Sequence, residues 1–298
     1  MGNTLYLECY NGISGDMTVA ALIDLGADKE VLSEALKSLN VDGFDTRISR
    51  VKKSGIDACD FEVLLDEDNH DHDMEYLYGH LHGEHVKEEH HHGEHHDHHH
   101  EHHHDDHDHQ HEHEHHHEDH DHHHEEHDHT HHETGHHHHH AHRGMKEITD
   151  IINKGVMTDG ARKLALHIFD ILAQAESKAH NVPVEEVHFH EVGAVDSIVD
   201  IVSIAVCLDN LNVEECIVTH LTEGKGTVRC QHGILPVPVP AVLHIVADNH
   251  IPLEITDITG ELVTPTGAAV AAAICTSHEL PKTFTVHRIG VGAGKRSY

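Results

Sequence analysis

Tryptophan is absent from the 298-residue sequence, and aromatic residues of all kinds make up only 3% of it. Because large aromatic side chains often dominate the packing of a core, their scarcity predicts a core built from aliphatic residues. Six cysteines are scattered along the chain, and none forms a C-x-x-C pair. This usage excludes a disulfide framework and is typical of reduced thiols in a cytoplasm.

Long apolar runs and basic side chains are also scarce. The most apolar stretch, 198–211, is interrupted by Asp200 and Asp209 and is shorter than the roughly 20 residues that span a bilayer. Lysine and arginine number 19 against 54 acidic residues, and the formal charge of −35 excludes a binder of nucleic-acid phosphates. Residues 1–4 lack the basic region of a signal peptide. We therefore predict a cytoplasmic protein that binds neither nucleic acid nor membrane.

Histidine, in contrast, is abundant and concentrated in one segment. Of 47 histidines, 37 lie within 66–142, together with 24 acidic residues and a single basic one, Lys87. The remaining 221 residues carry a milder net charge of −12, so the charge of the chain comes mostly from this insert. The insert has almost no aliphatic residues. Burial therefore cannot offset the entropy of ordering it, and we predict that it is disordered.

Outside the insert, strand-like and helix-like patterns alternate. Alternating apolar residues predict strands, and apolar residues at helical spacing predict helices. The expected strands are 4–9, 45–52, 57–65, 215–221, 253–256 and 284–289, and the expected helices are 15–25, 29–39, 159–179, 195–208, 241–248 and 268–275. We predict an α/β or α+β fold, a layered mixed sheet with helices. Its parts are an N-terminal segment (1–65), the disordered metal-binding insert (66–144) and a segment that completes the folded domain (145–298).

The composition of the insert predicts metal binding. Imidazole suits nickel, copper, zinc and cobalt, and the interspersed carboxylates add oxygen ligands and negative charge. Irregular spacing in a flexible chain favours several loosely bound ions, which mild acid should release by protonating the imidazoles. The alternatives are a solvated acidic linker or, for 136–140 alone, an engineered tag. The density of histidine, interleaved with acids, argues against both.

A second group of metal-ligand residues lies in 187–196, V-H-F-H-E-V-G-A-V-D. On an extended chain His188 and His190 point to the same face, and Glu191 and Asp196 follow closely. Two imidazoles with one or two carboxylates are a plausible ligand set for a divalent ion with open positions. Alternatively, Asp196 is a helix cap and the histidines bond the backbone. Since His-x-His alone is a weak motif, the residues leave both interpretations open.

Four turns rich in glycine or hydroxyl residues could present backbone N–H groups to an anion. They are 11–16 (N-G-I-S-G-D), 223–227 (E-G-K-G-T), 264–267 (T-P-T-G) and 290–295 (G-V-G-A-G-K). Taken singly, each is more typical of a tight turn or cap, and none is a G-x-x-x-x-G-K-[ST] phosphate loop. In the first turn, Ser14 is expected to cap the following helix, with Asp16 in its first turn.

The segment 232–241 contains three alternate prolines, Pro236, Pro238 and Pro240, which predict an extended wall without regular structure before the next helix. His232 stands at its entrance. This histidine is either a metal ligand or proton carrier, or a structural loop residue, and the sequence does not separate the two.

Four segments, taken together and in this order, resemble the LarC-type nickel insertion proteins of nickel-pincer cofactor biosynthesis. They are 11–17 (N-G-I-S-G-D-M), 189–197 (F-H-E-V-G-A-V-D-S), 232–241 (H-G-x-x-P-V-P-x-P-A) and 264–269 (T-P-T-G-A-A), and the insert lies where that family carries one. The resemblance implies insertion of Ni²⁺ into pyridinium-3,5-bisthiocarboxylic acid mononucleotide, which forms a carbon–metal bond flanked by two sulfur ligands. The product serves lactate racemase and related enzymes.

The resemblance further implies a lyase-type cyclometallation that consumes CTP and uses Mn²⁺ or Mg²⁺. Members of the family are usually longer and carry nucleotide binding in a C-terminal domain. We therefore expect a separately encoded C-terminal domain as a partner, and a homo-oligomer.

Nickel insertion needs desolvated Ni²⁺, two thiocarboxylate donors and a base for the ring proton, and a tract of weak ligands can raise the local Ni²⁺ concentration. The predicted residues are, for the metal, His188, His190, Glu191 and Asp196; for the mononucleotide, Gly12, Ser14, Gly15, Thr264, Thr266 and Gly267, with the turn at Gly12–Gly15 as the first choice for its phosphate; and for catalysis, His232 as base and Asp16. Two other functions stay open: a nickel storage or delivery protein without catalysis, and a nucleotide-dependent enzyme with an unrelated substrate. Affinity alone does not fix the metal, because imidazole favours copper over nickel.

Overall fold

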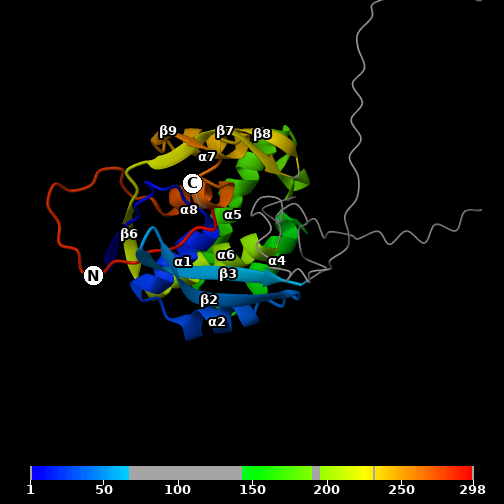
Figure 1. Cartoon of the computed structure of the whole chain (residues 1–298). Helices are drawn as coiled ribbons and strands as arrows, with labels where there is room; N and C mark the ends of the chain where they lie inside the picture. The colour runs from blue at the N-terminus through cyan, green and yellow to red at the C-terminus, as the bar shows by residue number, and fades with distance from the viewer. Residues whose placement is uncertain (1, 67–142, 190–194, 231, 297–298) are drawn as a thin grey trace, which may run out of the picture. The chain divides into compact units, whose positions relative to one another are not determined.

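The computed structural model describes residues 2–66, 143–189, 195–230 and 232–296 (Figure 1). The described stretches before and after the insert belong to one compact unit. Within them helices and strands alternate, which confirms the predicted α/β class. The prediction of a disordered insert concerns residues outside these ranges, apart from Asp66 and the two-residue strand β4 (Arg143–Gly144).

The N-terminal stretch contains β1 (Asn3–Tyr6), α1 (Gly15–Leu25), α2 (Lys29–Lys37), β2 (Phe44–Lys53) and β3 (Ile56–Leu65). The second stretch contains, after β4, the elements α4 (Met145–Lys154), α5 (Asp159–His180), the 3-10 helix η1 (Val184–Glu186), β5 (His188–Phe189), α6 (Val195–Asn210), β6 (Val213–Ile217), β7 (Leu221–Cys230), β8 (Gly233–Val237), α7 (Pro240–Asp248), β9 (Leu253–Thr259) and α8 (Pro265–Ile274). Every helix predicted from the sequence is present within a few residues, whereas α4 was not predicted.

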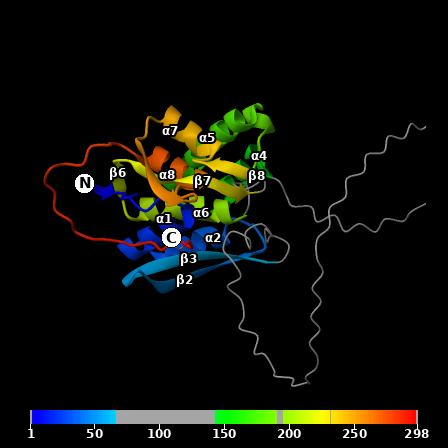
Figure 2. The ribbon, with the colours of Figure 1, turned by 45° about the horizontal axis from the view of Figure 1, so that its top comes forward.

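The helix α6 lies at the centre of the core. Apolar residues surround it on nearly all sides, and twelve of its residues are buried. It packs against α1, α2 and α5. In Figures 1 and 2 the β2–β3 hairpin and α2 lie on one side of α1 and α6, and the β7–β8–β9 sheet with α7 and α8 lies on the other. The core is aliphatic, as the composition predicts, with Phe61 and Phe169 among its few large aromatic side chains.

The strands of the described residues form small sheets. Strands β1 and β6 pair in parallel, with Tyr6 opposite Ile217. Strand β7 pairs in parallel with β9 and antiparallel with β8. The β2–β3 hairpin turns at Ser54 and Gly55, both with positive φ, as its sequence predicts. Because β1 and β6 run in parallel, the loops that leave their carboxyl ends lie at the same edge of the sheet. Ligands bind at this edge in many α/β proteins.

Two predictions about the β7–β8 region were wrong. The turn expected at 223–227 lies inside β7, and the segment expected to lack regular structure because of its prolines includes β8. Pro236 faces Thr227 of β7, and β8 has no second neighbour among the described strands. Proline has no backbone N–H to donate. It is tolerated there because one side of an edge strand has no neighbouring strand to accept such a bond.

The strand predicted at 284–289 is also wrong. These residues form no regular structure and pair with no described strand, and Phe284, Val286 and Ile289 are all exposed. The alternating pattern of these residues therefore does not correspond to a strand with a buried face. The strand predicted at 215–221 divides in two, because the chain leaves β6 at Ile217 and enters β7 at Leu221.

After this exposed segment the chain returns to the core along β3. The backbone N–H of Cys59 donates to the carbonyl of Val291 at 2.9 Å, and the N–H of Ala293 donates to the carbonyl of Cys59 at 2.8 Å. On the other side, Gly290 and Gly292 lie against the backbone of α1, where a Cβ atom on either residue would collide with a main-chain carbonyl. The alternate glycines of 290–295 therefore serve close packing on α1 and not the phosphate turn considered above.

Candidate functional site

The site is built around the first turn of α1. Ser14 occupies the N-cap position, but its side chain does not accept the expected hydrogen bond from the helix. Its hydroxyl donates to Asp16 Oδ1 instead, and this same carboxylate oxygen accepts the N–H of Met17 at 2.8 Å. The predicted Ser14 cap is therefore wrong, and Asp16 caps the helix from within its first turn.

The start of α8 lies beside the start of α1. The backbone N–H of Ile13 donates to the carbonyl of Leu262 at 2.9 Å, and Thr264 N–H donates to the carbonyl of Ile13 at 3.0 Å. A Cβ atom at Gly267 would collide with the Ile13 carbonyl, and one at Gly12, where φ is +85°, with that of Leu262. Glycine is thus required at both positions for the two loops to touch.

Thr264 caps α8 in the ordinary way, since its hydroxyl accepts the N–H of Gly267 at 3.1 Å. Thr266, in the first turn, is buried. The structure therefore brings together the six residues that the sequence predicted for the mononucleotide, Gly12, Ser14, Gly15, Thr264, Thr266 and Gly267.

The start of α6 supplies further carboxylates. Asp200 lies against Gly15 so closely that a Cβ atom there would collide with its carboxylate. Burial raises the pKa of Asp200 well above its ordinary value, and the negative charges of Asp16 and Asp196 raise it further. Burial also raises the pKa of Asp16, against the lowering effect of the Ser14 hydroxyl and Met17 N–H. These carboxyl groups therefore hold protons more tightly than ordinary aspartates, which suits them to exchange a proton or attract a cation.

Glu223 is a buried carboxylate that the sequence did not single out. Its side chain is fully buried, and Oε1 accepts three backbone N–H groups, from Gly224 at 2.8 Å, Leu262 at 2.6 Å and Val263 at 3.2 Å. Burial raises its pKa, against the effect of these donors. Its second oxygen, Oε2, has no hydrogen-bond partner among the described residues. In the sequence this glutamate looks like an ordinary turn residue, and only the fold reveals its burial.

Two cations lie at the end of the described chain. Lys295 Nζ pairs with Asp60 Oδ1 at 2.7 Å, and Arg296 donates to the backbone carbonyl of Glu261 at 2.6 Å. The charge of Lys295 lowers the pKa of both Asp16 and Asp200, so it partly offsets their burial. The segment that packs on α1 thereby supplies positive charge to the acidic site.

The predicted metal ligands are only partly described. Asp196 lies in the first turn of α6, close enough to Asp200 to raise its pKa, and the backbone of His188 pairs with Gly144. His190 and Glu191 lie outside the described residues, within 190–194. Among the residues that are described, no group of three or more His, Cys, Asp or Glu side chains is arranged to hold a metal ion. The four-residue nickel site therefore stays a prediction.

His232 lies elsewhere on the sheet. Its ring contacts that of His180 at the end of α5, with centroids 4.8 Å apart. It follows β7, in which the seven residue steps from Glu223 to Cys230 span about 23 Å at the usual strand rise. The structure thus groups His232 with α5, while Asp16, the other predicted catalytic residue, lies at the centre of the site.

Comparison with known proteins shows the family of the chain. The family model described as nickel insertion protein matches residues 5–298. The chain belongs to the nickel insertion protein family. No solved structure matches it.

The curated relatives carry a more specific name. Proteins named pyridinium-3,5-bisthiocarboxylic acid mononucleotide nickel insertion protein are 47% identical in Alkaliphilus metalliredigens, 35% in Acetivibrio thermocellus and 34% in Geobacillus kaustophilus. The matches cover 99%, 98% and 98% of this chain but 58%, 56% and 56% of the relatives. The chain thus spans a little over half the length of these members of the nickel insertion family. Within the described residues, no helix has the length and apolar character needed to cross a membrane.

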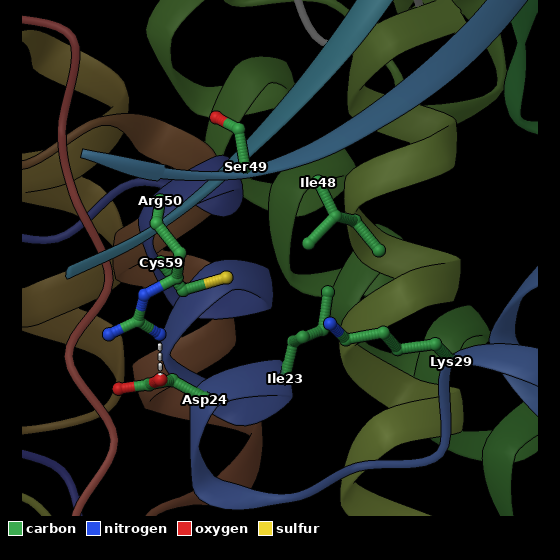
Figure 3. A pocket seen from close by; sticks show the side chains of 7 residues that line it. All are labelled: Ile23, Asp24, Lys29, Ile48, Ser49, Arg50 and Cys59. Atoms are coloured by element: carbon green, nitrogen blue, oxygen red, sulfur yellow. Dashed lines mark hydrogen bonds and ion pairs between the residues drawn. The ribbon is translucent and has the colours of Figure 1, made fainter.

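This member of the nickel insertion family also has a cavity of about 330 Å³ between α1 and the β2–β3 hairpin (Figure 3). Arg50 lies across it and bonds Asp24 on α1 and Asp57 on β3. Burial of Asp24 opposes ionisation, but the N–H of Val291 and the guanidinium of Arg50 hold its pKa below the ordinary value. Arg50, Asp24 and Asp57 are therefore paired with one another, which favours a structural role that ties α1, the hairpin and the segment after 290 together.

Proposed function

We propose that this chain receives Ni²⁺ and inserts it into pyridinium-3,5-bisthiocarboxylic acid mononucleotide, the compound for which its relatives are named. The product would be the nickel-pincer cofactor of lactate racemase-type enzymes. The observation that carries the proposal is the contact of Asp200 with Gly15, because it joins the start of α6 to the start of α1. The predicted nickel ligand Asp196 and the predicted substrate-binding loops would then meet at one place.

The carboxylates of this site suit the chemistry. Formation of a carbon–nickel bond releases the proton of the ring carbon, and a base must accept it. Asp16 and Asp200 have raised pKa values, which brings a carboxylate closer to the proton affinity that general-base catalysis needs at neutral pH. We assign proton acceptance to this pair. His232 stays a prediction without support from its placement beside His180.

The nickel ion is assigned to the segment that connects β5 to α6. This segment carries the predicted ligands His190 and Glu191 and leads directly into Asp196. Negative charge from the three aspartates at the starts of α1 and α6 would attract a divalent cation to this point. Asp196 is the one predicted nickel ligand whose side chain is described, and its position favours the assignment.

The phosphate of the mononucleotide is assigned mainly to the start of α8. The turn at Gly12–Gly15 is less suited, since the N–H of Met17 on α1 already bonds Asp16 and the backbone N–H of Asp16 lowers the pKa of the neighbouring Asp200. On α8, the hydroxyls of Thr264 and Thr266 and the positive end of the helix remain suited to an anion. Gly12, Ser14 and Gly15 would then shape the loop beside it.

The described residues do not fit a nucleotide-dependent step. They contain neither a phosphate loop nor three metal-ligand side chains that could hold the Mn²⁺ or Mg²⁺ of bound CTP. We therefore derive no step through CTP. The expected cytoplasmic location, the separately encoded C-terminal domain and the homo-oligomer likewise stay proposals, and size-exclusion chromatography with light scattering tests the last of them.

The test of the proposal is nickel binding by the full chain after His190→Ala with Glu191→Ala. Titration calorimetry should show that one tight class of site is lost while the many weak ones remain. The matched control is His180→Ala with Glu176→Ala, which removes another imidazole–carboxylate pair, 3.3 Å apart on α5, and should leave the tight class unchanged. An unchanged tight class in the first variant would reject this nickel site.

A non-catalytic storage or delivery protein is the alternative, and the 37 histidines of the insert favour it. It predicts only weak, exchangeable sites. The same titration therefore separates the two functions, since storage needs no tight single-ion class.

A further inference from the structure

A cluster of four side chains lies beside the candidate site and is used by none of the steps above. The hydroxyls of Tyr6 and Tyr10 are hydrogen-bonded at 2.9 Å. The ring of Tyr10 lies against that of His220, with centroids 5.0 Å apart and planes inclined by 32°. His220 Nε2 in turn lies 3.2 Å from Glu254 Oε2.

The cluster lies where the fold gathers its loops. Tyr6 ends β1 and Tyr10 stands in the loop that leads to α1, only four residues before Ser14. His220 lies between β6 and β7, and Glu254 is in β9 opposite Thr222. The carboxyl ends of the parallel strands β1 and β6 thus meet the beginnings of β7 and β9 at this point. Through Tyr10 the cluster is therefore continuous in sequence with the loop that leads to α1 and Asp16.

Both rings are fixed in orientation. The hydroxyl of Tyr10 is bonded to Tyr6, while the two nitrogens of His220 face the Thr219 hydroxyl at 3.2 Å and the carboxylate of Glu254. Tyr10 nevertheless remains 46% exposed. An exposed aromatic residue held in place by its neighbours offers a preorganised surface, which lowers the entropy cost of binding a flat ligand.

We propose that Tyr10 and His220 form a stacking platform for the pyridinium ring of the mononucleotide substrate. The electron-rich face of tyrosine attracts a planar cationic ring, and the Glu254 carboxylate adds negative charge at the edge. The phosphate at α8 and the ring on this platform would then orient the substrate toward Asp16. This inference rests on the proposed function, because that proposal supplies the substrate.

The test uses the full chain and two probes. Both probes contain a ribose and a phosphate. Nicotinic acid mononucleotide carries a pyridinium ring in addition, and ribose 5-phosphate does not. Tyr10→Ala should weaken binding of the first probe about tenfold by titration calorimetry and leave binding of the second unchanged. Tyr10→Phe keeps the ring and should bind nicotinic acid mononucleotide within about twofold of the original chain.

Phe284→Ala is the matched control, since Phe284 is another exposed aromatic residue, 54% accessible, outside the cluster. It should change neither affinity. Equal binding of both probes by the original chain, with no effect of Tyr10→Ala, would overturn the platform but leave the phosphate site standing. Tyr10-dependent binding of nicotinic acid mononucleotide without any binding of ribose 5-phosphate would support the platform and overturn the phosphate assignment. Failure of the original chain to bind either probe would overturn both.

Discussion

The Oε1 atom of Glu223 accepts a hydrogen bond of 2.6 Å from the backbone N–H of Leu262, and so a fully buried carboxylate fixes the loop that precedes α8. In the same loop, the carbonyl of Leu262 accepts a hydrogen bond from the N–H of Ile13, which precedes α1. Glu223 therefore positions both halves of the candidate site.

The buried carboxyl group of Glu223 should make the free energy of unfolding depend on pH. Burial raises the pKa of Glu223 in the folded chain, so the folded state binds its proton more tightly than the unfolded state. The free energy of unfolding should therefore fall as the pH rises from about 4.3, the ordinary pKa of glutamate, through the raised value. Glu223→Gln keeps an acceptor oxygen and should make this loss smaller, while Asp16 and Asp200, whose pKa values are also raised, keep their share of it. Urea unfolding between pH 4.5 and 7.5 measures it.

The control for this variant is Glu279→Gln, because Glu279 is exposed. It should leave the pH dependence as in the original chain. A Glu223→Gln variant with the original pH dependence would show that Glu223 titrates normally in the folded state.

The close packing of residues 290–294 on α1 should be intolerant of side chains. A Cβ atom at Gly292 would collide with the carbonyl of Met17, which is main chain and cannot move away without shifting α1. We expect Gly292→Val to lower the free energy of unfolding by about 2–3 kcal/mol. Gly144→Ala is the comparison, since the nearest atom to its Cβ is the mobile end of Glu147 at 3.4 Å. It should cost less than about 1 kcal/mol, and equal losses in the two variants would argue against the packing.

The sequence could predict the elements whose pattern is local. The all-round apolar run of α6 predicts a buried helix, and Ser54-Gly55 predicts the hairpin turn; both are confirmed. The α1–α8 convergence could not be predicted, because it depends on Ile13 bonding to residues some 250 positions away. For the same reason Glu223 looked like a turn residue, since its three donors come partly from the distant Leu262 and Val263.

The errors have a related cause. The segment 284–289 alternates like a strand, but a strand needs a neighbour, and none of the described strands provides one. Pro236 was expected to exclude a strand, yet β8 lies at an edge where its missing N–H costs nothing. Both outcomes depend on which strands lie side by side, which a local pattern does not contain.

The six thiols should react in two classes. Cys9, Cys59, Cys207 and Cys216 are buried, and burial raises the pKa of Cys9, Cys207 and Cys216 to about 12. Their thiolate fraction at pH 8 is therefore small, and reagent cannot reach them. Cys230 and Cys275 are partly exposed. A disulfide-exchange reagent should modify no more than these two residues rapidly in the folded chain and all six in guanidinium chloride; rapid modification of three or more would contradict the packing.

Nickel stoichiometry should separate the insert from the folded body. Replacing 67–142 by a flexible linker of about eight glycine and serine residues should leave the body folded, because the stretches on either side belong to one compact unit. Equilibrium dialysis with metal analysis should then find about one tightly bound nickel ion per chain, whereas the full chain should bind many. In the full chain, bound nickel should also fall between pH 7 and 5, because histidine with an ordinary pKa of about 6.5 exchanges metal for protons there. If the shortened chain is folded by circular dichroism yet retains no nickel at any concentration, the insert alone binds metal and the assignment of His190, Glu191 and Asp196 is wrong.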